Sequence, residues 1–332
     1  MSDSSSSSSL SLGSSSFLLR AGGSLPGSPL RSDHAARIHR VVEHIDRNLD
    51  QALTLPGIAA VANFSPYHFH RIFAAWMGET LGDYIRRRRV ETGALRLVSQ
   101  PRTTVLAVAL SVGFGSAESF TRAFRSRFGS SPSAWRRAAR AARGRESNPG
   151  QTERKHDQEV RADAGYSRTV PQREALMNVK LMDRAPVHVA YLTYVGEFGE
   201  PVSRFWQERA YPWMLTNNLV GRPRYGVSHD DPTITASDKT RYDAAVEVER
   251  AFSGTGDYHE SDLPGGRFAC VAFEGTATDI SEAWARLLRD WLPDSGLQLD
   301  ARPFYEYYAT TDRFDSRTGV FTCTLCIPVT GR

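Results

Sequence analysis

The residues best suited to chemistry in the amino-terminal half are arginines, hydroxyls and an acid placed between regularly spaced phenylalanines. In SVGFGSAESFTRAFRSRFG (residues 111–129), a phenylalanine recurs every fourth position, at Phe120, Phe124 and Phe128. This spacing stacks side chains on one face of an α-helix, so we expect a buried aromatic stripe with Glu118 and Arg122 on the outer face. Arginine can bond guanine O6 and N7 together, and glutamate can accept from cytosine N4. The pattern indicates a helix that could read DNA.

A shift of 51 positions maps this segment onto an earlier one, SPYHFHRIFAAWMG (residues 65–78). Equivalent residues match in both copies: Ser65 and Ser116, Phe69 and Phe120, Arg71 and Arg122, Phe73 and Phe124, Gly78 and Gly129, Tyr84 and Trp135. Each copy begins with a serine suited to cap a helix, and an apolar helical run precedes it. A repeat at fixed offset indicates two copies of one unit, here a helix-turn-helix.

The residues between the two copies predict one long helix. LGDYIRRRRVETGALRLVSQ (residues 81–100) has apolar residues at helical spacing and no proline. A rigid helix can hold two recognition helices about 34 Å apart, one turn of B-DNA, so a single chain could enter two successive major grooves. Four consecutive helical residues point in four directions, so we expect some of Arg86 to Arg89 to be solvated or paired with Asp83 rather than bound to DNA.

With these motifs, residues 35–140 resemble the DNA-binding domain of the AraC/XylS family of transcription regulators, most clearly in GFGSAESFTRAFRSRFGSSPSAWRR (residues 113–137). The resemblance implies base-facing positions at Tyr67, His70, Arg71, Ala117, Glu118 and Arg122. It implies phosphate contacts from Ser65, Ser116 and nearby arginines such as Arg125. Glu118 also has a structural interpretation, because an acid in the first helical turn stabilises the helix dipole.

The charges separate along the chain. Residues 31–145 hold 19 arginines, no lysine and 8 acids, a net charge of +11, whereas residues 175–332 hold 16 basic and 22 acidic residues, a net charge of −6. A basic half suits phosphates and an acidic half is repelled by them. We therefore expect four parts: a disordered Ser-rich tail (1–33), an all-α double helix-turn-helix domain (34–142), a linker (143–176) and a second domain (177–332).

Targeting and metal signals are weak. The serine-rich start lacks the pattern of a signal peptide, and no segment approaches the roughly 20 apolar residues of a membrane span, so we expect a cytoplasmic protein with no membrane partner. The three cysteines are expected to be free thiols. Cys323 and Cys326 form C-x-x-C in VFTCTLCIPV, but residues three apart on a strand point to opposite faces, so neither a metal site nor a cofactor is expected.

The second half also repeats. A shift of 78 moves Trp206 onto Trp284 and Trp213 onto Trp291, and a shift of 80 moves GRPRY onto ARPFY. Around these anchors each copy reads as a strand, a helix carrying both tryptophans, and two closing strands. Two such strand-helix-strand-strand units pack most simply as a pseudo-twofold α+β domain with a cleft between the copies.

This half resembles the GyrI-like effector-binding domain, through YGVSHDDP, RYDAAVEV, LPGGRFACVAFEG, WLPDSG and PFYEYY. The resemblance implies a glutamate in an aromatic pocket, here Glu306. A carboxylate among aromatic rings suits an organic cation, because each ring face adds roughly 0.5 to 2 kcal/mol of cation–π attraction. We expect the effector to contact Phe198, Trp213, Tyr242, Trp284, Trp291, Glu306 and Tyr308. The alternative for the tryptophans, including Trp206, is a place in the core.

Together these features predict a one-component transcription regulator and not an enzyme. Its partners would be double-stranded DNA, a small aromatic or cationic effector and RNA polymerase, with broad, multidrug-like effector selectivity. The alternative is a small-molecule hydrolase or detoxifying domain fused to a DNA-binding module, with Glu306 and Tyr308 or Tyr242 assisting water. No nucleophile–base set or metal cluster supports that alternative. An architectural DNA binder is a third interpretation.

Overall fold

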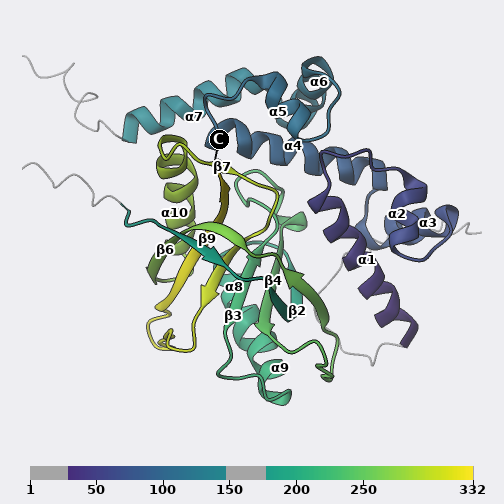
Figure 1. Cartoon of the computed structure of the whole chain (residues 1–332), viewed down its shortest axis with the longest axis vertical. Helices are drawn as coiled ribbons and strands as arrows, with labels where there is room; N and C mark the ends of the chain where they lie inside the picture. Colours follow the sequence, from purple (N-terminus) through teal and green to yellow (C-terminus); the bar gives the residue numbers. More distant parts are fainter. Residues whose placement is uncertain (1–28, 147–176, 332) are drawn as a thin grey trace, which may run out of the picture.

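The computed structural model describes residues 29–146 and 177–331, a helical half followed by a strand-rich half (Figure 1). The predicted tail, up to residue 28, and most of the predicted linker lie outside the described residues. The helical half extends slightly beyond the expected boundaries: α1 begins at Pro29, inside the expected tail, and α7 continues to Glu146, inside the expected linker.

Seven helices make the amino-terminal half. Their bounds are α1 (Pro29–Arg47), α2 (Leu55–Val61), α3 (Pro66–Met77), α4 (Leu81–Ser99), α5 (Val105–Ser111), α6 (Ala117–Phe128) and α7 (Pro132–Glu146). The pairs α2–α3 and α5–α6 are the two helix-turn-helix units. The second helices, α3 and α6, agree at the 51-residue offset, whereas α2 and α5 lie 50 residues apart, so the turn of the second unit is one residue longer. Each second helix ends at a glycine in the left-handed region, Gly78 at φ 68° and Gly129 at φ 69°, where a side chain would be strained.

The predicted aromatic stripe forms the core of each unit. Phe69 and Phe73 are fully buried with ring centroids 5.5 Å apart, and Phe120 and Phe124 repeat this at 5.4 Å. Phe128 is only partly buried, and its ring lies 4.8 Å from that of Trp135. The long helix α4 contributes to both cores, so the two units share one rigid element.

The carboxy-terminal half is built on one antiparallel sheet. Its strands are β1 (Lys180–Arg184), β2 (Val187–Val195), β3 (Arg224–Ser228), β4 (Arg241–Glu247), β5 (His259–Leu263), β6 (Gly266–Gly275), β7 (Gln298–Leu299), β8 (Phe304–Tyr308) and β9 (Phe321–Thr330). Their order is β1-β6-β9-β8-β3-β4-β2-β5, with β7 on β9. β3 pairs with β8 at the centre, and this pairing sets Gly226 opposite Glu306.

Two interrupted helical stretches pack against this sheet. The first comprises α8 (Glu200–Phe205), the π-helical η2 (Trp206–Ala210) and α9 (Tyr211–Thr216). The second comprises α10 (Asp279–Arg286), the π-helical η4 (Leu287–Trp291) and the 3₁₀ turn η5 (Leu292–Asp294). A separate turn, η3 (Ser237–Lys239), precedes β4. The sequence predicted one helix carrying both tryptophans in each copy; instead a π-helical turn interrupts each stretch. Such turns alter side-chain register and occur often at functional sites.

The two halves are in contact. Helix α4 packs on η4, η5 and β7, which places the middle of the helical half against the edge of the strand-rich half. Figure 1 shows α4 between the two halves, while α3 and α6 lie on the side away from the sheet. The helices that would enter DNA are therefore not covered by the sheet domain.

Candidate nucleic-acid interface and effector cavity

The first recognition helix presents its candidate residues to solvent. Ser65 occupies the N-cap position of α3, although its side chain makes no capping hydrogen bond, and Pro66 follows where its missing N–H costs nothing. Tyr67 is 75% exposed, and the guanidinium of Arg71 lies 6.0 Å from its ring centroid. His70 is exposed one position before Arg71. The polar face is therefore continuous and opposite the buried phenylalanines.

The second recognition helix has the same design with a stronger cap. The Ser116 hydroxyl accepts from the backbone N–H of Ser119 at 3.2 Å, and Ala117 begins the helix. Glu118 and Arg122 are exposed on its outer face, one turn apart. Hydrogen bonds from the Glu118 backbone N–H and from Ser116 lower the pKa of the Glu118 carboxyl. This end-of-helix geometry fits the structural interpretation of Glu118 and leaves the carboxylate free on the outside for a base contact.

Exposed arginines surround these faces, but most of the densest arginine run, Arg86 to Arg89, bonds to other groups of the protein. Arg125 is exposed on α6, and its side chain has no hydrogen bond or ion pair among the described residues. Arg86 pairs with Asp83 at 3.4 Å, as expected from the sequence. The Arg87 guanidinium contacts Glu79 at 2.7 Å, and Arg89 donates to backbone carbonyls in the turn after α1.

Arg88 has the most buried role of the four. Together with Asp46 of α1 and two residues of the sheet domain, Asp230 and Arg241, it forms a set of paired charges that we call the ionic cluster. Arg88 Nε donates to Asp46 Oδ1 at 2.8 Å, and its Nη1 pairs with Asp230. Arg241 donates to Asp230 Oδ2 at 2.8 Å and to Asp46 Oδ2 at 2.9 Å. Each arginine therefore bridges both carboxylates, and the four charges cancel.

The ionic cluster is largely excluded from water. Arg88, Asp230 and Arg241 are each at most 7% exposed. Burial opposes ionisation of Asp230, but Arg241 and Arg88 outweigh it and hold the pKa of that carboxyl well below its usual range. Buried charges are tolerated when they are paired and hydrogen-bonded in this way. The cluster joins α1, α4 and the sheet domain in one ion-pair network.

The loop between β3 and β4 (residues 229–240) extends these contacts to both helix-turn-helix units. Lys239 Nζ lies 3.1 Å from Glu79, which follows the first recognition helix. Thr235 donates to Glu91 Oε2 at 3.0 Å, and Glu91 accepts from Arg127 of the second recognition helix at 3.2 Å. One loop of the sheet domain therefore reaches the base of each recognition helix.

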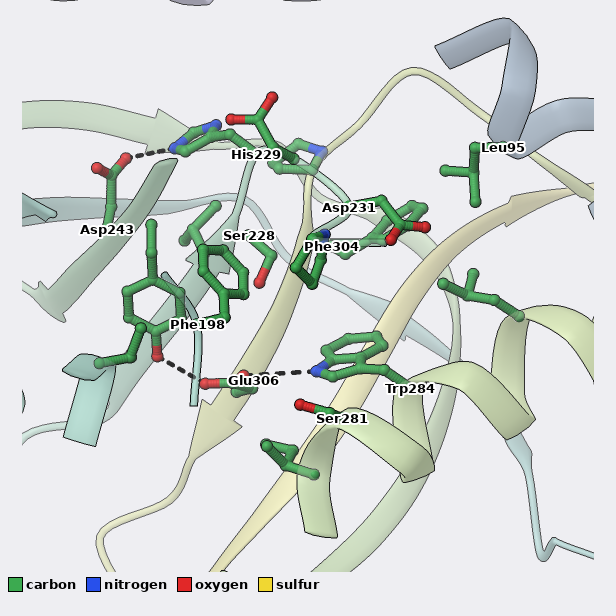
Figure 2. A pocket seen from close by; sticks show the side chains of 18 of the residues that line it. Leu95, Phe198, Ser228, His229, Asp231, Asp243, Ser281, Trp284, Phe304 and Glu306 are labelled. Carbon is green, nitrogen blue, oxygen red and sulfur yellow. Dashed lines mark hydrogen bonds and ion pairs between the residues drawn. The ribbon is translucent and has the colours of Figure 1, made fainter. Parts of the chain in front are cut away.

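Glu306 lies at the bottom of a large cavity (Figure 2). The carboxylate is 6% exposed and accepts three hydrogen bonds. Tyr242 Oη and Tyr308 Oη donate to Oε2 at 2.6 and 2.9 Å, and Trp284 Nε1 donates to Oε1 at 3.4 Å. Burial raises the pKa of Glu306, and the hydrogen bonds only partly offset this effect. Within the described residues no arginine or lysine forms an ion pair with it.

The cavity has a volume of about 1410 Å³ and aromatic walls around this carboxylate. Of the residues expected at the effector site, five line it: Phe198, Tyr242, Trp284, Glu306 and Tyr308. Trp213 and Trp291 lie outside its lining. Trp213 donates to the Thr255 carbonyl at 2.9 Å, and its ring centroid lies 5.7 Å from that of Tyr258. Trp291, the last residue of η4, packs on the hydrophobic core. Both tryptophans therefore fit the alternative of a place in the core.

Sequence reasoning missed three residues around Glu306. Trp206, an anchor of the repeat that was not among the expected effector contacts, lines the cavity and donates from Nε1 to Tyr242 Oη at 2.9 Å. Phe304 also lines the cavity and stacks on Trp284 with an interplanar angle of 21°. Gly226 lies opposite Glu306, and a Cβ there would overlap Tyr242 Oη and the Glu306 carboxylate. The only feature of the sequence that pointed to Gly226 was its position in the motif YGVSHDDP.

The cysteines are free, as expected, but one pairing was not foreseen. Cys323 and Cys326 face different core clusters, which confirms that the C-x-x-C is not one site. Cys326 instead lies beside Cys270 across β9 and β6, with 3.5 Å between the sulfur atoms. Residues 29–146 and 177–331 contain no cluster of three or more potential metal ligands. None of the helices described is long and apolar enough to cross a membrane.

Comparison with known proteins matches both halves. Residues 177–330 match the family model of a GyrI-like small molecule binding domain, and residues 58–138 match that of a helix-turn-helix domain. The regulatory protein SoxS of Salmonella typhimurium is 33% identical over 103 residues, which cover 31% of this chain and 95% of SoxS. The chain belongs to the AraC/XylS family. It is therefore a DNA-binding transcription regulator with a GyrI-like small-molecule binding domain.

The chain is also similar to two other proteins. The transcriptional regulator Rob of Salmonella typhimurium is 25% identical over 308 residues, which cover 90% of this chain and 99% of Rob. The transposon Tn10 TetD protein of Escherichia coli is 39% identical over 107 residues, which cover 32% of this chain and 77% of TetD. The similarity to Rob spans the helical and the strand-rich halves together, and these matches indicate no catalytic family.

Proposed function

We propose that this regulator senses a small organic cation, aromatic in part, that binds in the cavity with its charge at Glu306. The observation that carries the proposal is a buried carboxylate with three aromatic hydrogen-bond donors and no cationic partner among the described residues. An unpaired buried carboxylate is costly, and a cation would supply the missing counter-charge. The ring of Trp284 would add cation–π attraction.

Broad selectivity belongs to the same proposal. A wide cavity with flat aromatic walls imposes few directional requirements on the ligand. The arrangement of the sheet domain as two related copies is also a proposal. It is supported by the strand order, in which β6-β9-β8 on one side corresponds to β2-β4-β3 on the other.

For DNA, we propose base contacts from Tyr67, His70 and Arg71 in the first unit and from Ala117, Glu118 and Arg122 in the second. Phosphate contacts would come from Ser65, Ser116 and Arg125. The exposure of Tyr67, His70 and Arg71 on α3 and of Glu118, Arg122 and Arg125 on α6 supports these roles. We also propose that the protein recruits RNA polymerase, which the family resemblance supports, and in vitro transcription from a promoter that carries the bound sequence would test it.

The central experiment separates a sensor from an enzyme. Calorimetry of the full chain would compare an aromatic quaternary ammonium ion with its neutral isostere, in the natural protein and in Glu306→Gln. We expect the substitution to weaken only the cation. DNA and ligand must then alter each other's affinity by the same factor. Consumption of the compound, followed by mass spectrometry, without such reciprocity would support the hydrolase instead.

A further inference from the structure

The cavity that contains Glu306 is not confined to the sheet domain. Its wall also includes Thr92 and Leu95 of α4 and Trp135 and Ala139 of α7, all from the DNA-binding half. The volume of about 1410 Å³ exceeds the 300 to 1,000 Å³ of an ordinary ligand site. A compound that fills the space near Glu306 leaves a further chamber between the two halves.

Leu95 is an apolar residue of α4 in the wall of this chamber. It is partly buried and packs on the same hydrophobic cluster as Trp284 and Phe304. Figure 2 shows Leu95 on α4, on the same side of the cavity as Trp284. Since Trp284 also donates to Glu306, one tryptophan borders the carboxylate and the interdomain chamber. A ligand that lies along this ring would have its charged end at Glu306 and its other end at α4.

We propose that the effector site is a composite of the two halves and takes an elongated amphiphilic cation, whose charged head lies at Glu306 and whose apolar tail lies against Leu95. The inference rests on the proposed function for the head group and adds the tail and its partner. Helix α4 joins both helix-turn-helix units, so a tail bound there contacts the element that fixes their separation. A short cation that occupies only the Glu306 end would bind without contacting the DNA-binding half.

The test uses a homologous series of alkyltrimethylammonium ions, from ethyl to decyl, below their micelle-forming concentrations. Binding to the full chain is measured by calorimetry for the natural protein, Leu95→Ala and Glu306→Gln. Each methylene buried against the chamber wall should raise affinity about fourfold. Leu95→Ala should lower the affinity for the decyl ion about tenfold and change that for the ethyl ion less than about twofold. Glu306→Gln should weaken every member of the series.

Two further variants control for folding. Leu106→Ala removes an exposed leucine from α5 of the same half, outside the cavity lining, and should change no affinity. Ala139→Leu adds bulk to the α7 wall and keeps Leu95 intact. It should lower the affinity for the decyl ion and not for the ethyl ion, which a general loss of folding would not do.

The outcomes distinguish the two levels of the hypothesis. If Leu95→Ala and Ala139→Leu affect ethyl and decyl ions equally, or affect neither, the composite site is wrong and the head-group site stands. If no ion binds, or Glu306→Gln changes none of the affinities, the proposed function fails and the composite site fails with it. A chain-length dependence that disappears in Leu95→Ala while the dependence on Glu306 persists supports both.

Discussion

Arg241 and Tyr242 are adjacent on β4 and serve different halves of the molecule. The Arg241 guanidinium bonds Asp46 of the DNA-binding half, whereas the Tyr242 hydroxyl donates to Glu306 in the cavity. Successive side chains on a strand point to opposite faces, so one backbone segment carries the interdomain contact and the cavity contact. The predictions below test the parts of the molecule that meet at this strand and the recognition helices that depend on it.

The first prediction concerns DNA. Arg122→Ala should weaken specific binding by about 1 to 3 kcal/mol and relax preference at one base pair, because a bidentate base contact is lost. Arg125→Ala should weaken all sequences alike and reduce the slope of log affinity against log salt by about 1, as loss of one phosphate contact does. Gel-shift titrations on specific and random DNA measure both effects. An equal loss on both DNAs for Arg122→Ala would contradict its base-reading role.

The second prediction concerns the ionic cluster. Asp230→Ala leaves Arg88 and Arg241 buried with half of their counter-charge, which should cost about 3 to 5 kcal/mol in the free energy of unfolding. Asp238→Ala changes an exposed acid in the same loop and should shift stability by less than about 0.5 kcal/mol. Urea unfolding followed by tryptophan fluorescence compares them. Equal midpoints for the two variants would mean that the cluster contributes nothing to stability.

The third prediction is a pH dependence that arises at Glu306. Burial raises its pKa, so between the unfolded and folded pKa values the folded protein holds a proton that the unfolded chain has released. Stability therefore falls as pH rises through this window and is level above it. Affinity for a permanent cation rises over the same window, because the cation binds the ionised form. Calorimetry in buffers of different ionisation enthalpy should detect proton release on binding.

The matched variant for this prediction is Glu306→Gln. Because Gln does not ionise, its weaker cation binding should be flat across the window and should release no proton at this position. The pKa values of Tyr242 and Tyr308, the hydroxyls that face Glu306, are raised well above 10, so these groups do not titrate in the same range. A pH profile that persists unchanged in Glu306→Gln would assign the titration to another group.

The fourth prediction concerns Gly226. An added methyl group would overlap Tyr242 Oη and the Glu306 carboxylate, so Gly226→Ala should separate them. A hydrogen bond to a charged group is worth about 1.5 to 3 kcal/mol, so cation affinity should change by about 10- to 100-fold. Gly82→Ala, where a Cβ meets nothing, is the control. Unchanged affinity in Gly226→Ala would show that the Tyr242 contact does not shape the site.

Local patterns predicted the helical half well, because spacing and caps are local properties of the chain. The 51-residue repeat placed both recognition helices, from Ser65 and Ser116 at their N-caps to the glycines at their ends. The same patterns did not assign Arg88. A run of four arginines indicates a basic surface, and only the approach of Asp230, 142 positions further along the chain, makes one of them an interdomain residue.

The candidate cavity was predictable only in part for the same reason. Glu306 came from a resemblance, and its partners Tyr242 and Trp284 lie far from it in sequence. Each helical stretch carries two tryptophans seven residues apart, Trp206 and Trp213 in the first and Trp284 and Trp291 in the second. A π-helical turn lies within each stretch and changes which of its two tryptophans faces the cavity. The spacing of the tryptophans does not reveal the extra residue in a π-helical turn, so the sequence wrongly placed Trp213 and Trp291 at the effector site and left Trp206 out.

The contacts of the β3–β4 loop limit how freely this architecture can exchange its parts. Lys239 forms an ion pair with Glu79, and Thr235 donates a hydrogen bond to Glu91. Asp230 forms an ion pair with Arg88. Fusing this sheet domain to another DNA-binding domain, or this DNA-binding domain to another sensor, would leave buried charges without partners. Recombination between such proteins would therefore have to transfer the loop together with α1 and α4, and the two halves are expected to diversify as one inherited unit.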